Sequence, residues 1–333
     1  MTNPASRWLG KTGVRVSPLA LGCMSFGGDA DEATSAALYA RARDAGVTFF
    51  DTADVYNHGR SEELLGRLTA GARDELVVAT KAYFPTGPDG NARGTSRYHL
   101  VRACEASLRR LGRDHVDVYY LHRWDDRTDL DETLRAMDDL VRAGKVLYPA
   151  CSNFAAWQVA RALGAAALGR LAPLVAIQPM YNLLKRQAEV ELLPMAEALG
   201  VAVVPYSPTA GGLLTGKWGV AKRPDSGRMT SNAMYQTRYA DPAYLAAADG
   251  LTAIAAELGV APAALAVAWV LGHPAVTSVL LGARDVAQLD QLLTATAIAM
   301  TPALRARIAA LVPEPPPATD RNEERSSANY GAR

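Results

Sequence analysis

The chain has 333 residues, 49% of them hydrophobic, and its 35 Lys and Arg residues nearly balance its 34 Asp and Glu residues. This balance gives no reason to expect nucleic acid or an anionic membrane surface as a partner. No apolar run reaches the roughly 18 residues that a membrane span needs, and residues 1–9 lack the apolar core of a signal peptide. The three cysteines, Cys23, Cys104 and Cys151, are too few for a disulfide framework. We therefore expect a reduced, cytoplasmic protein.

Strands and helices are predicted to alternate along almost the whole chain. After a short hairpin over 7–16, the predicted strands are 18–22, 47–51, 76–80, 116–121, 146–151, 174–177, 201–205 and 278–281. The predicted helices are 32–45, 61–69, 96–111, 130–142, 155–168, 188–199, 243–258, 262–271 and 285–295, with an irregular stretch over 208–240. Eight strands, each followed by helix, predict an α/β protein that closes as a (β/α)8 TIM barrel. An open doubly wound sheet is the alternative on pattern alone.

Prolines bear on two of the strands and on the end of the domain. Pro149 and Pro205 cannot donate to a sheet ladder, so their two strands have the weakest support from the sequence. A proline-rich segment, 313–317, opens a mostly polar tail. We therefore place the barrel in residues 1–312 and expect residues 313–333 to be disordered.

Polar side chains gather where the predicted strands end. The strand 47–51 ends in Asp51, a short polar loop then presents Tyr56, and Ser61 is the predicted N-cap of the next helix. Other strands end in the same way, at Lys81, His122, Ser152, Asn153, Gln178, Tyr206 and Gly282. One such residue means little, because a polar residue must end most strands. In a barrel, however, Asp51, Lys81 and His122 would converge on one mouth, at the end where α/β proteins place their chemistry.

The chemistry of these residues suits the reduction of a carbonyl to an alcohol. A lysine at the end of a buried strand needs a carboxylate partner, and Asp51 is available. A tyrosine has a reference pKa of about 10, and a nearby ammonium lowers it by favouring the phenolate. Tyr56 beside Lys81 would therefore exchange a proton with substrate. His122 could hydrogen-bond the same substrate oxygen.

These residues occur in motifs that resemble the aldo-keto reductase family over nearly all of residues 7–311. The motifs are Asp51-Thr52-Ala53-Asp54-Val55-Tyr56, Ala79-Thr80-Lys81, Tyr120-Leu121-His122, Ser152-Asn153-Phe154, Gln178-Pro179-Met180-Tyr181-Asn182, Tyr206-Ser207-Pro208, Gly211-Gly212-Leu213-Leu214-Thr215-Gly216-Lys217 and Gly282-Ala283-Arg284. No single motif is specific, but together they are. The resemblance implies a barrel that binds extended NADP(H) without a Rossmann domain and reduces a small carbonyl compound.

The resemblance also implies a role for each matching residue. Tyr56 would be the general acid, tuned by Lys81 and Asp51, and His122 would orient the carbonyl. Ser152, Asn153 and Gln178 would hold the carboxamide, Tyr206 would stack on the nicotinamide, residues 207–217 would cover the pyrophosphate and residues 282–291 would hold the adenosine end. The full set of expected cofactor residues is Met24, Asp51, Ser152, Asn153, Gln178, Tyr206, Ser207, Pro208, Thr209, Gly212, Lys217, Gly282, Arg284, Gln288 and Gln291.

Two parts of the expected site depend on individual side chains. Arg284 would bind the 2′-phosphate that distinguishes NADPH from NADH, because a guanidinium makes charge-assisted hydrogen bonds to phosphate. Asp285 would cap the following helix. Four residues that follow catalytic strand ends are candidates for the substrate pocket, with exposed loop positions as the alternative: Tyr83, Phe84, Arg123 and Trp124.

Some positions depart from the usual family pattern. Thr209 stands where leucine is usual, Asp290-Gln291 stands where Glu-Asn is usual, and Pro149 replaces a more flexible residue. These departures leave the four catalytic residues intact and affect only the expected phosphate and adenine contacts.

The same residues bear on three other functions. Residues 211–217 have the spacing of a P-loop, but Trp218 stands where Ser or Thr is required. A regulatory NADPH-binding subunit remains open, because potassium-channel beta subunits resemble this fold and keep the four catalytic residues. A metal-dependent barrel hydrolase would need a ligand cluster, and only Asp51 and His122 lie at strand ends, so no metal is expected. The physiological carbonyl and the oligomeric state stay open.

Overall fold

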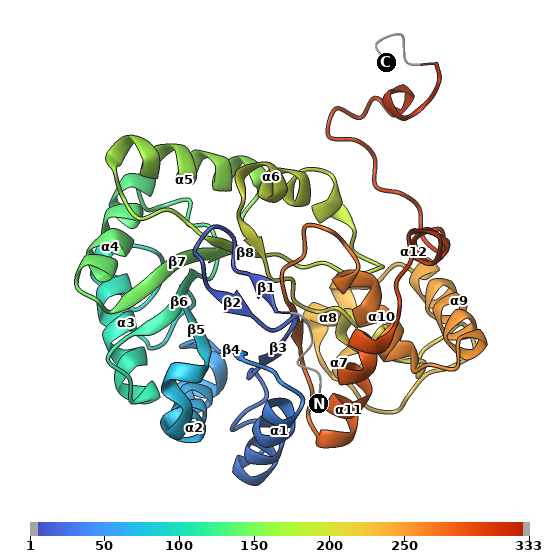
Figure 1. Cartoon of the computed structure of the whole chain (residues 1–333), viewed down its shortest axis with the longest axis horizontal. Coiled ribbons are helices and arrows are strands. Elements are labelled where there is room, and N and C mark those ends of the chain that lie inside the picture. Colours follow the sequence, from blue (N-terminus) through green and yellow to red (C-terminus); the bar gives the residue numbers. More distant parts are fainter. Residues whose placement is uncertain (1–5, 329–333) are drawn as a thin grey trace.

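Eight parallel strands form the centre of the molecule in the computed structural model, which describes residues 6–328 (Figure 1). They are β3 (Leu19–Gly22), β4 (Phe49–Asp51), β5 (Val77–Ala82), β6 (Val116–Leu121), β7 (Val146–Ser152), β8 (Ala176–Gln178), β9 (Ala202–Val203) and β10 (Val279–Leu281). Their order in the sheet is β10-β3-β4-β5-β6-β7-β8-β9. Hydrogen bonds from Thr277 N to Val203 O (2.8 Å) and from Leu280 N to Pro205 O (3.0 Å) join the two ends of the sheet. The predicted (β/α)8 barrel is confirmed.

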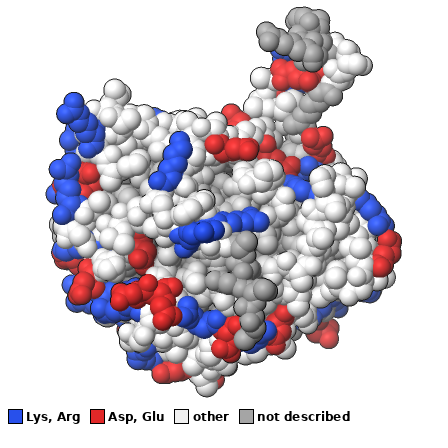
Figure 2. Space-filling model, in the orientation of Figure 1, with Lys and Arg blue, Asp and Glu red and all other residues white. Residues whose placement is uncertain are grey.

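Helices cover the outside of this barrel (Figure 1). They include α1 (Glu32–Asp44), α2 (Arg60–Thr69), α3 (Arg97–Leu111), α4 (Leu130–Arg142), α5 (Ala156–Gly169), α6 (Leu192–Leu199), α9 (Ala243–Glu257), α10 (Pro262–Leu271) and α11 (Val286–Leu293). The large apolar core lies between helices and strands, and a smaller cluster fills the barrel interior. On the face seen in Figure 2, acidic and basic side chains are interspersed, in keeping with the balanced composition.

The predicted hairpin, β1 (Arg7–Trp8) and β2 (Arg15–Val16), covers the amino end of the barrel. Leu9 and Val16 belong to the interior cluster. Gly10 approaches so closely that a Cβ atom there would lie 2.9 Å from Val175 O and 3.0 Å from Gly200 O. Because this end is filled, only the carboxyl ends of the strands are left to open into a site.

The structure differs from the predicted elements mainly in connecting segments. The stretch 208–240 is not irregular: it contains η4 (Ala210–Thr215), α7 (Arg228–Ser231) and α8 (Ala233–Arg238). The sequence analysis also missed α12 (Pro302–Ala309), whose N-cap Thr301 accepts from Leu304 N. Strand β7 runs through Pro149, whose carbonyl still accepts from Val175 N at 2.9 Å. Strand β9, in contrast, ends before Pro205.

Several short 3-10 helices complete the described chain. They are η1 (Tyr56–Gly59), η2 (Ala70–Glu75), η3 (Gln187–Glu189), η5 (Thr294–Ala297) and η6 (Asn322–Arg325). After α12 the chain leaves the barrel (Figure 1), and the predicted disorder of 313–333 stays a prediction. Within residues 6–328, no single helix is long and apolar enough to cross a membrane. Helices α9 and α10 together have the length and composition of a membrane span, but they are bent by 97° relative to each other.

The prediction that Ser61 caps a helix is wrong. Helix α2 begins at Arg60, and Gly59, in a left-handed conformation, occupies the N-cap without a side-chain bond. Ser61 is fully buried inside the first turn, where its hydroxyl donates to Cys23 O at 2.7 Å and lies 2.7 Å from the Thr52 hydroxyl. The residue therefore ties the helix to the loops after β3 and β4, a tertiary role that the local sequence does not reveal.

A buried group of ionisable side chains surrounds the start of helix α2, close in sequence to Tyr56. Glu62 of α2 is fully buried and accepts from Thr80 Oγ1 and from Arg110 Nε, each at 2.6 Å. Asp54 is 2% exposed, and neither of its carboxylate oxygens has a hydrogen-bond partner among the described residues. Burial and the neighbouring Glu62 raise the pKa of Asp54 to about 8, while Arg110 acts in the opposite direction. Asp54 is therefore a carboxyl that this fold holds in its neutral form.

We predict that Gly66→Ala destabilises the protein by about 1–3 kcal/mol, the usual cost of overpacking a tight contact. A Cβ atom at Gly66 in α2 would lie 2.7 Å from Leu111 Cα, in backbone that cannot rotate away. Chemical denaturation measures the loss. Gly71→Ala is the control, because nothing lies within 4 Å of a Cβ there, and equal stability of the two variants would contradict the predicted contact.

Asp54 should also make the folding stability depend on pH. Its folded pKa of about 8 lies above the unfolded value of about 3.9. The folded state therefore holds the proton more tightly, and this contribution is complete below about pH 4 and is lost as the pH rises to about 8. Asp54→Asn stays neutral, so its free energy of unfolding should fall less than the wild-type value between pH 5 and pH 8. Asp44→Asn, at the exposed end of α1, should follow the wild type. Parallel curves for wild type and Asp54→Asn would contradict the raised pKa.

Candidate active site

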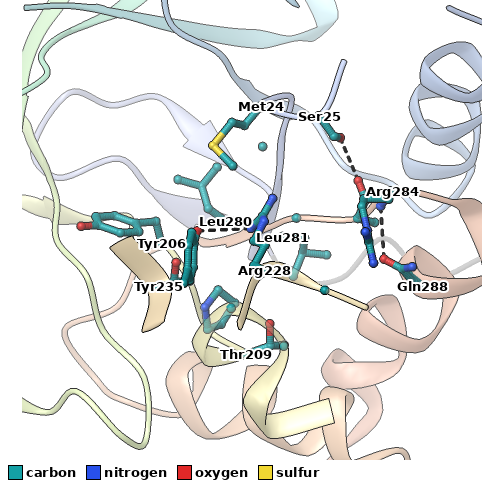
Figure 3. A pocket seen from close by; sticks show the side chains of 18 of the residues that line it. Met24, Ser25, Tyr206, Thr209, Arg228, Tyr235, Leu280, Leu281, Arg284 and Gln288 are labelled. Atoms are coloured by element: carbon teal, nitrogen blue, oxygen red, sulfur yellow. Dashed lines mark hydrogen bonds between the residues drawn. The ribbon is translucent and has the colours of Figure 1, made fainter. Parts of the chain in front are cut away.

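One large cavity, of about 850 Å3, opens at the carboxyl ends of the barrel strands. Figure 3 shows its elongated part, with Tyr206 near one end, Arg284 and Gln288 at the other, and Arg228 and Tyr235 between them. All expected cofactor residues line it: Met24, Asp51, Ser152, Asn153, Gln178, Tyr206, Ser207, Pro208, Thr209, Gly212, Lys217, Gly282, Arg284, Gln288 and Gln291. The fold therefore brings these distant motifs to one place.

A buried ion pair forms the floor of the cavity. Lys81 in β5 is fully buried, and its ammonium donates to Asp51 Oδ1 at the end of β4 and, at 2.8 Å, to Thr52 O. The second carboxylate oxygen of Asp51 accepts from Gln178 Nε2 at 2.9 Å. Burial opposes the charge of Lys81, but Asp51 and Tyr56 outweigh it and raise the pKa of the ammonium above its usual value. The lysine therefore stays charged beneath the cavity floor.

Tyr56 lies above this pair, at the start of η1. Its ring centroid is 5.2 Å from Lys81 Nζ and 5.8 Å from the His122 ring, which it meets edge-on. The two residues after it, Asn57 and His58, have positive φ angles of 48° and 55°. Asn57 Nδ2 donates to Met24 O at 3.0 Å and to Phe26 O at 2.8 Å. These bonds hold the uncommon turn and thus position the tyrosine.

The surroundings shift the pKa values of both residues. Burial raises the pKa of Tyr56 above its usual value, and Lys81 lowers it by less. Lys81 therefore lowers the pKa of Tyr56 as expected, but burial has the larger effect. The net shift of this pKa is upward, which keeps Tyr56 protonated. Burial, with the charge of Lys81, lowers the pKa of His122 well below its usual value, so its imidazole is neutral at pH 7. The cavity floor thus combines a protonated phenol and a neutral imidazole.

The ends of β7 and β8 and the loop after β9 present amide and hydroxyl groups beside these rings. Asn153, with a φ of 57°, donates to His122 O at 2.9 Å and accepts from the Tyr206 hydroxyl at 2.8 Å. Ser152 donates to Gln178 O at 2.8 Å. Tyr206 is thereby fixed as one wall of the cavity, which Met24 also lines (Figure 3).

The other end of the cavity has the character of an anion site. Arg284 is exposed, and its backbone N–H donates to Gln288 Oε1 at 3.2 Å. Asp285 caps α11, as expected, because its carboxylate accepts a hydrogen bond from Gln288 N at 2.8 Å. The Ser25 hydroxyl donates to Ala283 O at 2.8 Å and connects the loop after β3 to this site (Figure 3). Asp290 pairs with Arg41 of α1 at 2.5 Å, whereas Gln291 lines the cavity.

The structure divides the four substrate candidates into two pairs. Phe84 and Arg123 line the main cavity, and the Phe84 ring lies 4.8 Å from the His122 ring. Trp124 instead lines a small separate cavity and packs on Phe154 at 5.2 Å. Tyr83 contacts Phe84 edge-on at 5.3 Å and is not among the residues that line the main cavity.

Residues 224–238 supply a wall of the cavity whose individual side chains were not identified from the sequence. Arg228 Nη1 donates to the Tyr235 hydroxyl at 3.3 Å, and Met234 and Arg238 line the same wall. The Tyr235 ring packs on Gly211, where a Cβ atom would lie 2.7 Å from Tyr235 Cε1. No strand end marks this segment in the sequence, and two arginines ten residues apart with a tyrosine between them are too weak a pattern to identify it. Within residues 6–328, no group of three or more His, Cys, Asp or Glu is placed to hold a metal ion.

Comparison with known proteins agrees with this geometry. The model of the aldo/keto reductase family matches residues 18–313. Similar proteins include an uncharacterized oxidoreductase of Bacillus subtilis, 41% identical over 88% of this chain and 91% of the relative. A probable voltage-gated potassium channel subunit beta of Arabidopsis thaliana is 39% identical over 85% of this chain and 88% of the relative. The versiconal hemiacetal acetate reductase of Aspergillus parasiticus is 30% identical over 88% of this chain and 93% of the relative. With this match and the barrel described above, the chain belongs to the aldo/keto reductase family.

Proposed function

We propose that this protein is an NADPH-dependent reductase of aldehydes or ketones. The observation that carries the proposal is the arrangement of Tyr56, Lys81, Asp51 and His122 at one end of an elongated cavity. Its other end carries Arg284 at the start of a helix. A proton donor and an anion site joined by one cavity suit a carbonyl substrate and a phosphate-bearing cofactor.

The residues present fit NADP(H). Lys217, Arg228 and Arg284 line the cavity, and none of them forms an ion pair within the described chain. They would hold the diphosphate and the 2′-phosphate by charge-assisted hydrogen bonds. Tyr206, held by Asn153, would be the platform for the nicotinamide, with Ser152, Asn153 and Gln178 near its carboxamide. When bound, the cofactor supplies the hydride.

The protein would supply the proton and the orientation. Neutral His122 can donate a hydrogen bond to the carbonyl oxygen and hold it beside Tyr56. Tyr56 then gives its proton to that oxygen as negative charge develops there. Lys81, paired with Asp51, stabilises the phenolate that remains, because its ammonium lies 5.2 Å from the ring centroid.

A regulatory NADPH-binding subunit is the second candidate. It is supported by relatives named as potassium channel beta subunits in Arabidopsis thaliana and Oryza sativa, at 39% and 38% identity. The four catalytic residues are present in either case. Steady-state turnover with a broad aldehyde panel separates the two, because a purely regulatory subunit would bind NADPH without sustained reduction.

Tyr56→Phe should lower kcat for aldehyde reduction by at least about a hundredfold, because it removes the transferable proton. Cofactor affinity, measured by fluorescence titration, should stay within about twofold, since the ring and the Lys81–Asp51 pair remain. Tyr98→Phe removes an exposed hydroxyl on α3 and is the matched control. Near-native turnover of Tyr56→Phe would rule out Tyr56 as the acid.

Arg284→Ala should raise the dissociation constant of NADPH roughly tenfold and leave that of NADH almost unchanged. Hydrogen bonds to charged groups contribute about 1.5–3 kcal/mol, and only NADPH has the 2′-phosphate. Arg135→Ala, which removes an exposed arginine of α4, controls for net charge. An equal loss for both cofactors, or none for either, would show that the phosphate is bound elsewhere.

A further inference from the structure

Five basic side chains line the main cavity: Arg123, Lys217, Arg228, Arg238 and Arg284. None of the five forms an ion pair with any residue in 6–328. The one carboxylate in the lining, Asp51, is already satisfied by Lys81 and Gln178. The cavity therefore has an excess of positive charge, which favours anionic ligands.

The cofactor of the proposed function uses only part of this charge. Along the elongated cavity, Arg284 lies at one end and Arg228 in the middle (Figure 3), and Lys217 belongs to the same segment, 207–217, that lines it. These three cations line the part of the cavity where the diphosphate and the 2′-phosphate of the cofactor would bind. Arg238 lies 5.1 Å from the Tyr235 ring centroid and 3.5 Å from Met234 Sδ, so the aromatic wall holds it.

Arg123 is the cation that remains, and it lies beside the catalytic groups. It directly follows His122, whose ring is 5.8 Å from that of Tyr56 and 4.8 Å from that of Phe84. The next residue, Trp124, points into the separate small cavity against Phe154. Arg123 lines the main cavity, is exposed and has no hydrogen-bond partner in the described chain. Arg123 therefore follows a residue of the reaction site directly, and no partner in the described chain keeps its guanidinium from a ligand in the cavity.

We propose that the physiological substrate is a carbonyl compound that also carries a carboxylate, and that Arg123 binds this carboxylate while Tyr56 and His122 hold the carbonyl. The inference rests on the proposed reductase function and names its substrate class. A planar guanidinium matches a carboxylate with two parallel hydrogen bonds. One free guanidinium also balances a singly charged group better than a doubly charged phosphate. Phe84 and Val55 line the cavity and suit an apolar body between the two polar ends.

Two isosteric aldehydes test the proposal: 4-carboxybenzaldehyde, which is anionic, and 4-nitrobenzaldehyde, which is neutral. Arg123→Gln keeps a polar side chain, although a shorter one, and removes the charge. At saturating NADPH, it should lower kcat/KM for the carboxylate about tenfold, mainly through KM, and change kcat/KM for the nitro compound less than twofold. Comparing each substrate with itself cancels the different reactivity of the two carbonyls. Arg127→Gln, an exposed arginine in the same loop outside the cavity lining, should affect neither substrate.

A binding measurement separates this inference from the proposed function. Calorimetry with NADP+ present would compare 4-(hydroxymethyl)benzoate with 4-nitrobenzyl alcohol on wild type and Arg123→Gln. If neither aldehyde is reduced but the benzoate binds in an Arg123-dependent way, the reductase proposal fails and the carboxylate site stands. If Arg123→Gln weakens both compounds equally, or leaves the carboxylate unaffected, the carboxylate site is wrong even though reduction proceeds. Tighter binding of 4-formylphenyl phosphate than of 4-carboxybenzaldehyde, dependent on Arg123, would also overturn the choice of a carboxylate.

Discussion

The buried ion pair between Lys81 and Asp51 is the interaction on which the rest of the site depends. Taking two charges out of water costs several kcal/mol for each ion, unless close pairing and further hydrogen bonds compensate. Here Thr52 O and Gln178 Nε2 supply those bonds, so the pair persists although it is almost completely buried. Asp51 and Lys81 come from the adjacent strands β4 and β5, whereas Gln178 comes from β8, which is not a neighbour of either strand in the sheet. Only a closed barrel brings the three together.

The barrel also decides which end is open. The hairpin seals the amino end with Leu9 and Val16, and small interior residues such as Ala79 and Ala150 let the strands pack without a channel. At the carboxyl end the polar strand termini remain unfilled, and loops of very different lengths rise around them. Chemistry at this end does not disturb the packed layers below, which is why one scaffold can hold a proton donor and an anion site at either end of one cavity.

Backbone conformations that are uncommon for residues other than glycine cluster around this opening. Asn57, Asn153 and Ser207 all have positive φ angles. Each is held by surrounding bonds: Asn57 and Asn153 donate to backbone carbonyls, and the carbonyl of Ser207 accepts from buried Asn182 at 3.0 Å. Such conformations cost roughly 1–3 kcal/mol each and persist only where neighbours over-determine them. The result is a rigid rim in which Tyr56 and Tyr206 keep their orientations.

The sequence by itself determined the alternation of strand and helix, and hence the barrel, because apolar runs and their polar ends repeat with a regular period. It also determined which residues gather at the mouth, since parallel strands place their carboxyl ends at one edge. The capping role of Asp285 was likewise determined by the sequence, because it depends only on local spacing.

Tertiary structure alone decided the rest. Ser61 points inward, where it contacts Thr52 in the preceding loop and Cys23, 38 residues away in the sequence. Trp124 and Arg123, adjacent in the chain, were separated into two cavities by the packing of Phe154. Arg228 and Tyr235 became a wall because Gly211 leaves room for the tyrosine ring. Side-chain direction and long-range contact depend on neighbours that sequence order does not reveal, so these outcomes required the folded chain.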